Sequence, residues 1–191
     1  MTNKPLSILH TESSTGWGGQ EIRILTEAAG MIARGHKVVL VTPPEAEIAP
    51  AAVKRGIPTV TPPMAWKNWE GFRAMRAYLK EHGHEFDVIN THSSTDSWLV
   101  AAACATLPNM PPLVRTRHVS TTIHNKLTTK WLYQKATRHI VTTGEALRQQ
   151  LHNDNGFTLD SMTSIRTGID LGYYKPLDQQ DMRTKLGVQN R

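Results

Sequence analysis

Cysteine is almost absent from this chain. The single cysteine, Cys104, has no partner for an intramolecular disulfide, which excludes a disulfide-stapled secreted scaffold. It lies in the apolar stretch Ala101–Ala105, where a small buried side chain is the ordinary role of a free cysteine. Because a chain without disulfides suits a reducing compartment, we expect a cytoplasmic protein.

Long hydrophobic runs are also missing. The longest apolar stretch, around residues 98–107, is far shorter than the ~20 residues that a helix needs to cross a bilayer. The N-terminal segment, residues 1–7, lacks the apolar core of a signal peptide. These observations favour a soluble protein that is at most peripheral at the inner face of a membrane.

A third absence is any block of like charges. The chain has 22 Lys and Arg residues against 16 Asp and Glu, a formal net charge of +6, but the basic residues are dispersed. Without a basic arm or an aromatic-basic RNA-binding motif, nucleic-acid binding is only a minor alternative. The basic balance still favours polyanionic partners, among them anionic lipids and nucleotide phosphates.

Glycine, by contrast, is concentrated near the start of the chain. Three glycines follow the apolar run Leu6–His10: Gly16, Gly18 and Gly19. An amphipathic helix pattern begins directly afterwards, at Glu21. A strand, a glycine-rich loop and a helix N-terminus in this order form a site for an anionic group, because unpaired N–H groups of the first helical turn point at it. A plain tight turn would use the same glycines, so the motif favours a phosphate site without establishing it.

Apolar periodicity predicts strands and helices in alternation. After the first strand we expect strands at residues 37–42, 58–61, 87–91, 113–118, 139–142 and 162–165. We expect helices at residues 21–34, 48–55, 68–82, 94–105, 128–138 and 145–151. This alternation predicts an α/β fold, a Rossmann-like parallel sheet with helices on both faces. In such sheets ligands bind at the carboxyl ends of the strands.

A dinucleotide-binding turn is a competing interpretation of the glycines. It requires the pattern G-x-G-x-x-G, but Glu21 occupies the position of the third glycine. It also requires an acidic residue at the end of the second strand, where Val41 and Thr42 lead into two prolines. Both departures disfavour NAD as the ligand.

Five short segments, in their order and spacing, carry a resemblance to a known family. They are Gly18–Glu21, Asp87–His92, Arg115–His118, Val141–Glu145, and Thr167–Asp170 with the following Tyr174–Pro176. On these segments the chain resembles the N-terminal half of a GT-B glycosyltransferase of family 4, a group that includes lipopolysaccharide, mannosyl and sucrose-type sugar transferases. The stretches Thr91–Trp98 and Arg115–Ser120 further resemble a subset that acts on cell-envelope polysaccharides.

Four residues are assigned to the donor side of the reaction. The resemblance implies that Gly18 and Gly19 close over the donor diphosphate; Arg117, at the end of the same strand as His118, is our candidate for a further phosphate contact. The resemblance also implies that His118 lies beside the transferred sugar, contacts it by a hydrogen bond and takes part in catalysis. For His118 the alternative is a strand-end histidine that is bonded to backbone.

The acceptor side is assigned to a second set of residues: His92, Ser93, Arg115 and Glu21. His92 suits an acceptor contact better than a metal ligand, because no second ligand residue accompanies it at metal-binding spacing. Glu21 is also typical of a first helical turn, where it would interact with the helix dipole. Arg115 and Arg117 lie two apart on a strand and so point to one face, where either a phosphate or a packing carboxylate would suit them.

The domain organisation follows from the resemblance as well. We expect residues 1–176 to form the acceptor-side domain and residues 177–191 to resemble an interdomain linker. The family implies a second Rossmann-like domain, with most of the nucleotide-sugar site, which this sequence lacks. It further implies a retaining transfer from a nucleotide-diphosphate sugar to a glycan or glycolipid acceptor, with neither a cofactor nor a catalytic metal. The 191-residue chain alone is therefore expected to be inactive.

Two charged segments invite other interpretations. Residues 64–80 combine aromatic side chains with Lys and Arg, which suits either an anionic membrane surface or a core helix with a charged outer face. We favour the core helix. His82 and His84, flanked by Glu81 and Glu85, have a composition seen in metal sites, but a solvated helix end explains them better.

Two other functions stay open. One is a non-catalytic module that binds a glycan or glycolipid in the acceptor groove but has no donor site. The other is a fragment of a sugar-nucleotide epimerase on the same scaffold, which would need acidic catalytic residues that the sequence does not reveal.

Overall fold

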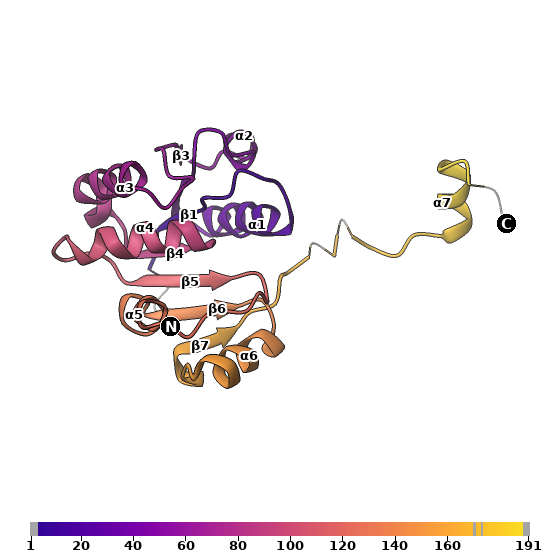
Figure 1. The fold of residues 1–191 in the computed structure, drawn as a ribbon. Coiled ribbons are helices and arrows are strands. Elements are labelled where there is room, and N and C mark those ends of the chain that lie inside the picture. Colours follow the sequence, from indigo (N-terminus) through magenta and orange to yellow (C-terminus); the bar gives the residue numbers. More distant parts are fainter. Residues whose placement is uncertain (1–3, 170, 173, 189–191) are drawn as a thin grey trace.

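The strands of the chain form a parallel sheet (Figure 1). The computed structural model describes residues 4–169, 171–172 and 174–188. The sheet has seven strands in the order β3-β2-β1-β4-β5-β6-β7. These are β1 (Ser7–Thr11), β2 (Lys37–Val41), β3 (Thr59–Val60), β4 (Val88–Thr91), β5 (Leu113–Arg117), β6 (His139–Thr142) and β7 (Met162–Ser164). All neighbouring pairs are parallel, so the predicted Rossmann-like α/β class is confirmed.

Helices cover both faces of this sheet (Figure 1). They are α1 (Gly19–Ala33), α2 (Ile48–Lys54), α3 (Trp69–His82), α4 (Ser94–Ala105), α5 (Leu127–Trp131) and α6 (Glu145–Asn155). Short helical turns lie at η1 (Gly83–Glu85), η2 (Leu132–Ala136) and η3 (Leu159–Ser161). The two apolar cores place α1 and α2 on one face and α3, α4 and α6 on the other.

Alternating side chains divide the interior into two apolar cores. In β1, Ile8 packs in one core with Ile24 of α1, whereas Leu9 packs in the other with Met75 of α3 and Leu99 of α4. Successive side chains of a strand point to opposite faces of the sheet. The face on which a residue at a strand end lies therefore follows from its position in the strand. His10 therefore lies on the α1 side of the sheet.

The order of the strands reverses between β1 and β4. From β1 the chain builds outward to β2 and β3, and it then returns to place β4 on the opposite side of β1. Ile8 is in register with Val88, and Thr11 with Thr91, so the loops that follow these two strands start side by side. Ligands of open α/β sheets bind outside the carboxyl ends of the strands at such a switch point.

The helix expected at residues 128–138 differs from its prediction. It begins at Leu127, and its second half, η2, is a π-helix. The wider π turn carries Leu132 and Tyr133, which are both buried in the core. The pattern of apolar residues is the same for a π turn and an α turn over so short a distance, so periodicity alone did not reveal it.

The helix α6 runs past its predicted end at residue 151 to Asn155. Gly156, with a φ of +68°, closes it in the left-handed conformation that glycine adopts without strain. Asn155 itself is buried, and its side-chain amide donates to the carbonyl oxygen of Ile123 at 3.0 Å. A tertiary contact thus holds the last turn, which local sequence patterns do not encode.

The expectation of a core helix at residues 64–80 is only partly correct. Met75 and Leu79 of α3 are buried, and Phe72 packs against the same core. Trp66 and Trp69, however, are 74% and 70% exposed. The helix buries its Met75 face, and both tryptophans lie outside the core.

Beyond β7 the chain leaves the sheet and runs to a separate short helix, α7 (Gln179–Lys185) (Figure 1). Asp178 caps this helix by accepting from the backbone N–H of Asp181 at 2.9 Å. Asp170 and residues 189–191 lie outside the described residues. The domain boundary at residue 176 and the linker role of residues 177–191 stay predictions.

Candidate active site

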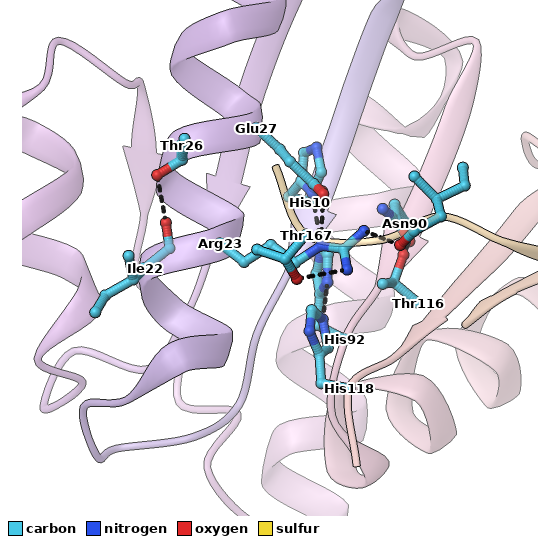
Figure 2. Close-up of polar contacts among 11 residues, drawn as sticks. His10, Ile22, Arg23, Thr26, Glu27, Asn90, His92, Thr116, His118 and Thr167 are labelled. Atoms are coloured by element: carbon cyan, nitrogen blue, oxygen red, sulfur yellow. Dashed lines mark hydrogen bonds and ion pairs between the residues drawn. The ribbon is translucent and has the colours of Figure 1, made fainter. Parts of the chain in front are cut away.

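The carboxyl ends of three neighbouring strands bring three histidines together (Figure 2). His10 belongs to β1, His92 directly follows β4, and His118 directly follows β5. His10 and His92 are buried, whereas His118 is half-buried. Two residues to which the sequence assigned functions, His92 and His118, are therefore in contact at the switch point.

The three imidazoles form a continuous chain. Nδ1 of His10 lies 2.7 Å from Nε2 of His92, and Nδ1 of His92 lies 2.9 Å from Nε2 of His118. The rings of His10 and His92 are inclined by 11° with centres 5.0 Å apart, and those of His92 and His118 by 38° with centres 5.2 Å apart. Such short N–N contacts at these centre distances join ring edges, not ring faces. Both contacts are hydrogen bonds between neighbouring imidazoles.

The environment keeps these histidines neutral. Burial lowers the pKa of His10 to about 4. Burial, followed by the positive charge of Arg23, lowers the pKa of His118 to about 4. Burial also lowers the pKa of His92 well below its usual range, with the neighbouring histidines and Arg23 acting in the same direction. At neutral pH each ring therefore has one N–H and one lone pair.

Arg23 of α1 lies beside the histidine chain (Figure 2). Its Nε donates to Oε1 of Glu27 at 2.5 Å, and its Nη1 donates to Oγ1 of Thr167 at 3.1 Å. Its Nη2 donates to the carbonyl oxygen of Ile165 at 3.1 Å. Arg23 thereby connects α1 to the segment after β7 and keeps a buried positive charge near the site.

The glycine loop leads into α1 on the same edge of the sheet. Gly18 is the N-cap of α1 in an extended conformation, and it offers no side chain to the first-turn N–H groups. A Cβ built on exposed Gly19 would meet no atom within 4 Å. The buried Glu21 bends back toward the loop, with Oε2 3.5 Å from the corresponding position on Gly18. The first turn of α1 has no side-chain cap, so its N–H groups are able to accept an anionic group beside the Glu21 carboxyl.

A buried carboxylate, Asp96, ties β1 to the start of α4. Its Oδ2 accepts from the hydroxyl of Thr11 at 2.8 Å and from the backbone N–H of His92 at 2.9 Å. Its Oδ1 accepts from the hydroxyl of Ser93 at 2.9 Å. Burial raises the pKa of Asp96, while these hydrogen bonds act in the opposite direction. Asp96 thus fixes the loop that carries His92 and Ser93, and Ser93 serves as the N-cap of α4.

A second carboxyl group, Glu12, lies directly after β1. It accepts from the side chain of Gln20 in α1 and from the backbone N–H of Ser14 at 2.7 Å. Burial, with the charge of Asp96 as the next cause, raises the pKa of Glu12 to about 8. Glu12 is thus largely protonated at neutral pH and joins the glycine loop to the sheet.

Arg115 and Arg117 share one face of β5, as the sequence predicted, but it is the face opposite to His118. The Arg115 guanidinium lies over the ring of Tyr133, 4.7 Å from its centre, while its buried Nε and Nη1 have no hydrogen-bond partner among the described residues. Arg117 donates to the Tyr133 hydroxyl at 3.1 Å and to Thr121. The phosphate and acceptor contacts proposed for these arginines stay predictions.

A large cavity lies elsewhere in the molecule. A cavity of about 770 Å³ opens at the amino ends of β5 to β7, lined by Cys104, Trp131, Tyr133 and Ser161 among others. Cys104 is half-buried there rather than buried, and burial raises the pKa of its thiol to about 11. This cavity lies at the wrong end of the sheet for a switch-point ligand, so we do not regard it as the active site.

Neither a metal cluster nor a spanning helix is found in the described part of the chain. No three His, Cys, Asp or Glu side chains there are arranged to hold an ion. His82 contacts Glu85 at 2.8 Å on an exposed helix end, in agreement with the solvated alternative. Each described helix is too short or too polar to cross a bilayer.

Sequence reasoning missed four residues of this site: His10, Glu12, Arg23 and Asp96. All four are buried in the structure. A histidine that ends an apolar strand was the available signal for His10. Buried polar groups need partners, so their burial pattern marks them as parts of a network.

The comparisons with known proteins agree on the fold. The model of Glycosyltransferase Family 4 matches residues 17–173. No curated protein sequence matches significantly. A glycosyltransferase from Rickettsia africae has a similar structure, with a TM-score of 0.76 and 16% identity over 98% of this chain and 51% of that chain.

Two further solved structures are similar. Anabaena Alr3699/HepE, in complex with UDP-glucose, has a TM-score of 0.74 and 18% identity over 97% of this chain and 51% of that chain. The lipopolysaccharide outer core galactosyltransferase WaaB has a TM-score of 0.63 and 10% identity over 90% of this chain and 49% of that chain. The present chain thus spans about half the length of these structures.

Proposed function

Because the chain belongs to glycosyltransferase family 4, we propose that it forms the acceptor-side half of an enzyme that moves a sugar from a nucleotide-diphosphate donor to a glycan or glycolipid. One observation carries this proposal: the uncapped N-terminus of α1, at Gly18 and Gly19, lies on the same sheet edge as His118. An anion-binding helix end and a neutral hydrogen-bonding side chain are what a sugar diphosphate requires.

The donor would approach with its diphosphate toward Gly18 and Gly19. Their backbone N–H groups and the helix dipole favour negative charge, whereas the charge of the buried Arg23 is paired with Glu27. His118 would then face the sugar. The phosphate contact predicted for Arg117 would have to be made from the opposite face of β5, where Arg117 binds Tyr133 and Thr121. Similarity to a structure that contains UDP-glucose supports a nucleotide-sugar donor.

The acceptor would be held by the loop after β4 and its surroundings, with Ser93 and Glu21 as the proposed direct contacts. His92 would act through His118, because both of its ring nitrogens are engaged, and Arg115 would have to reach the acceptor from the opposite face of β5, where it lies over Tyr133. In the reaction that we propose, the bond between the sugar C1 and the diphosphate oxygen breaks, and the acceptor oxygen bonds to C1 on the same face of the ring. The acceptor proton passes to the departing diphosphate. Backbone N–H groups at the helix terminus would stabilise the charge that develops on this leaving group.

A second domain would complete this site. The chain spans about half of its structural relatives, and the site described above offers little to bind a nucleobase or a ribose. We therefore infer that those parts of the donor are bound by another Rossmann-like domain, and that residues 177–191 lead toward it. The isolated chain would then be inactive as a transferase.

A peripheral membrane contact would suit a lipid-linked acceptor. Trp66 and Trp69 are exposed, and basic residues of α3 lie on its outer surface next to them: Arg73, Arg76 and Lys80. Tryptophan side chains insert at the level of lipid headgroups, while lysine and arginine attract anionic lipids. We propose that this surface faces an anionic bilayer at the cytoplasmic side.

Nuclear magnetic resonance tests the proposed donor site. UDP-glucose is titrated into the ¹⁵N-labelled 191-residue chain, and shifts are expected first at Gly18, Gly19 and His118. Gly19→Asp should abolish those shifts, whereas Gly19→Ala should keep them. Shifts confined to the cavity around Cys104 would overturn the proposal. A non-catalytic glycan-binding module would respond to oligosaccharides but not to the nucleotide sugar, and an epimerase would convert the sugar without any acceptor.

A further inference from the structure

The histidine chain permits only two arrangements of its protons. A neutral imidazole has one N–H donor and one lone pair. His92 uses both of its ring nitrogens, Nε2 toward His10 and Nδ1 toward His118, so it donates at one side and accepts at the other. The two hydrogen bonds must therefore run in the same direction along the chain, either outward from His10 or inward from His118.

The buried end of the chain decides between these directions. Nε2 of His10 is fully buried and has no hydrogen-bond partner among the described residues. If the bonds ran inward, this nitrogen would carry an orphaned N–H, which is rare in folded proteins. If they run outward, it keeps only a lone pair, which is tolerated better. The outward direction is therefore favoured: His10 donates to His92, and His92 donates to His118.

The outward direction determines what His118 offers to a ligand. Its Nε2 accepts from His92 and must therefore be unprotonated. The proton of a neutral His118 is then on Nδ1, the ring nitrogen that does not contact His92. His118 is the half-buried end of the chain, so its N–H is the one that a ligand at the switch point can reach.

We propose that His10 and His92 are positioning residues, which hold His118 as a neutral Nδ1–H hydrogen-bond donor aimed at an oxygen of the sugar. This inference rests on the proposed function for the identity of the ligand, but the proton arrangement itself belongs to the free protein. Arg23, which faces the chain from α1, disfavours a second proton on His118, as does Arg115 at His92. The Nδ1–H group of His118 is thus available as a hydrogen-bond donor while the imidazole ring stays uncharged.

The tautomer can be read directly from the ligand-free protein. The long-range ¹⁵N–¹H spectrum of the ¹⁵N-histidine-labelled chain at neutral pH distinguishes a protonated ring nitrogen from an unprotonated one. We expect an unprotonated Nε2 and a protonated Nδ1 for His118. The opposite assignment in the wild-type chain would overturn the proposal without any variant.

Two substitutions of His92 provide the matched comparison. In His92→Asn the side-chain amide can replace Nδ1 as a donor to His118, so the Nδ1–H tautomer of His118 should persist. In His92→Phe an aromatic ring is kept at position 92, but the N–H group that donates to His118 is lost. His118 should then shift to the Nε2–H tautomer. Identical His118 signals in both folded variants would show that His92 does not set the tautomer. These spectra are recorded without a nucleotide sugar. A negative result for the tautomer is therefore independent of the result of the UDP-glucose titration.

Discussion

His10 and His92 contact each other across the point at which the strand order of the sheet reverses. Their ring nitrogens are 2.7 Å apart, although the residues are separated by 82 positions in the sequence. The contact joins the two halves of the sheet at its ligand-binding edge and extends to His118. A single hydrogen-bonded chain thus couples the register of β1 and β4 to the residue that we expect to touch the sugar.

His118 is predicted to contribute to catalysis more than to stability. Losing a hydrogen bond that strengthens in the transition state costs about 10²–10³ in rate, or about 2.7–4 kcal/mol. In an enzyme that carries both domains, His118→Ala should lower kcat by this factor, while the free energy of unfolding changes little. His139→Ala, at the other end of the sheet, is the control. A variant of His118 that unfolds more easily but keeps its kcat would identify a structural residue.

Gly19 is predicted to be intolerant of negative charge. The position is open, so a side chain fits without displacing its surroundings. In Gly19→Asp a carboxylate would repel the donor diphosphate at the helix N-terminus, and turnover by the two-domain enzyme should be nearly abolished. Gly19→Ala adds the same Cβ without charge and should retain turnover. Thermal melting of both variants checks that the fold is intact; equal kinetics for both would contradict the prediction.

The positions of strands and helices were predictable because they depend on local patterns. Short apolar runs mark β1 and β2, and the helical spacing of apolar residues marks α1. The glycine loop and His118 were found because short motifs carry them. The partner of His118 was not, since contacts between strands depend on register and strand order. Neither the register nor the strand order can be determined from the residues of one strand. The reversal between β1 and β4 is a property of the whole sheet.

Side-chain direction limited the prediction for the arginines in a different way. Their spacing correctly placed Arg115 and Arg117 on one face of β5. The same alternation places His118 on the opposite face, but it did not reveal that α1 covers that face or that Tyr133 lies against both arginines. The π turn that positions Tyr133 differs from an α-helix by only one residue per turn, which apolar periodicity over five residues does not resolve.

Glu12 is predicted to make stability depend on pH. Its pKa is raised in the folded protein to about 8, compared with about 4.5 when exposed. Its stabilising contribution is therefore complete below about pH 4.5 and is lost as the pH rises through 8. His10, with a pKa lowered to about 4, acts in the opposite sense: its contribution is present above about pH 6.5 and is lost as the pH falls.

Glu12→Gln separates these two effects, because glutamine does not ionise. The free energy of unfolding of the wild type should fall as the pH rises from about 6 to about 9, and that of the variant should not. The difference between the two should therefore grow in favour of the variant by on the order of 3 kcal/mol. Urea unfolding at both pH values measures the difference. The exposed Glu70→Gln is the control and should follow the wild type. Parallel pH profiles for Glu12→Gln and the wild type would mean that Glu12 is ionised in the folded chain.

Trp66 and Trp69 are predicted to bind anionic membranes. The double variant Trp66→Ser, Trp69→Ser should lose most of its co-sedimentation with vesicles that contain phosphatidylglycerol, and binding by the wild type should weaken as salt is added. Leu127→Ser removes another exposed apolar side chain, 86% accessible, and should bind as the wild type does. Equal loss in both variants, or equal binding to neutral vesicles, would exclude this surface as a specific anionic-membrane contact.

The 191-residue chain alone is predicted to have no transferase activity. The donor contacts that we assign to it are the N–H groups of Gly18 and Gly19, nearby cations and His118. A few charge-assisted hydrogen bonds, at about 1.5–3 kcal/mol each, are largely offset by an association cost of ~4–15 kcal/mol.

Affinity for a nucleotide sugar should therefore be millimolar or weaker, which corresponds to about −4 kcal/mol. Calorimetric titration of UDP-, GDP- and ADP-sugars measures this affinity, and a radiolabelled transfer assay measures turnover. Joining to this chain, in one polypeptide, the part of the Rickettsia africae glycosyltransferase that it does not match should restore tight binding if the remaining donor contacts lie there. Micromolar binding or repeated turnover by the 191-residue chain would show that its own residues hold the whole donor, and that no second domain is required.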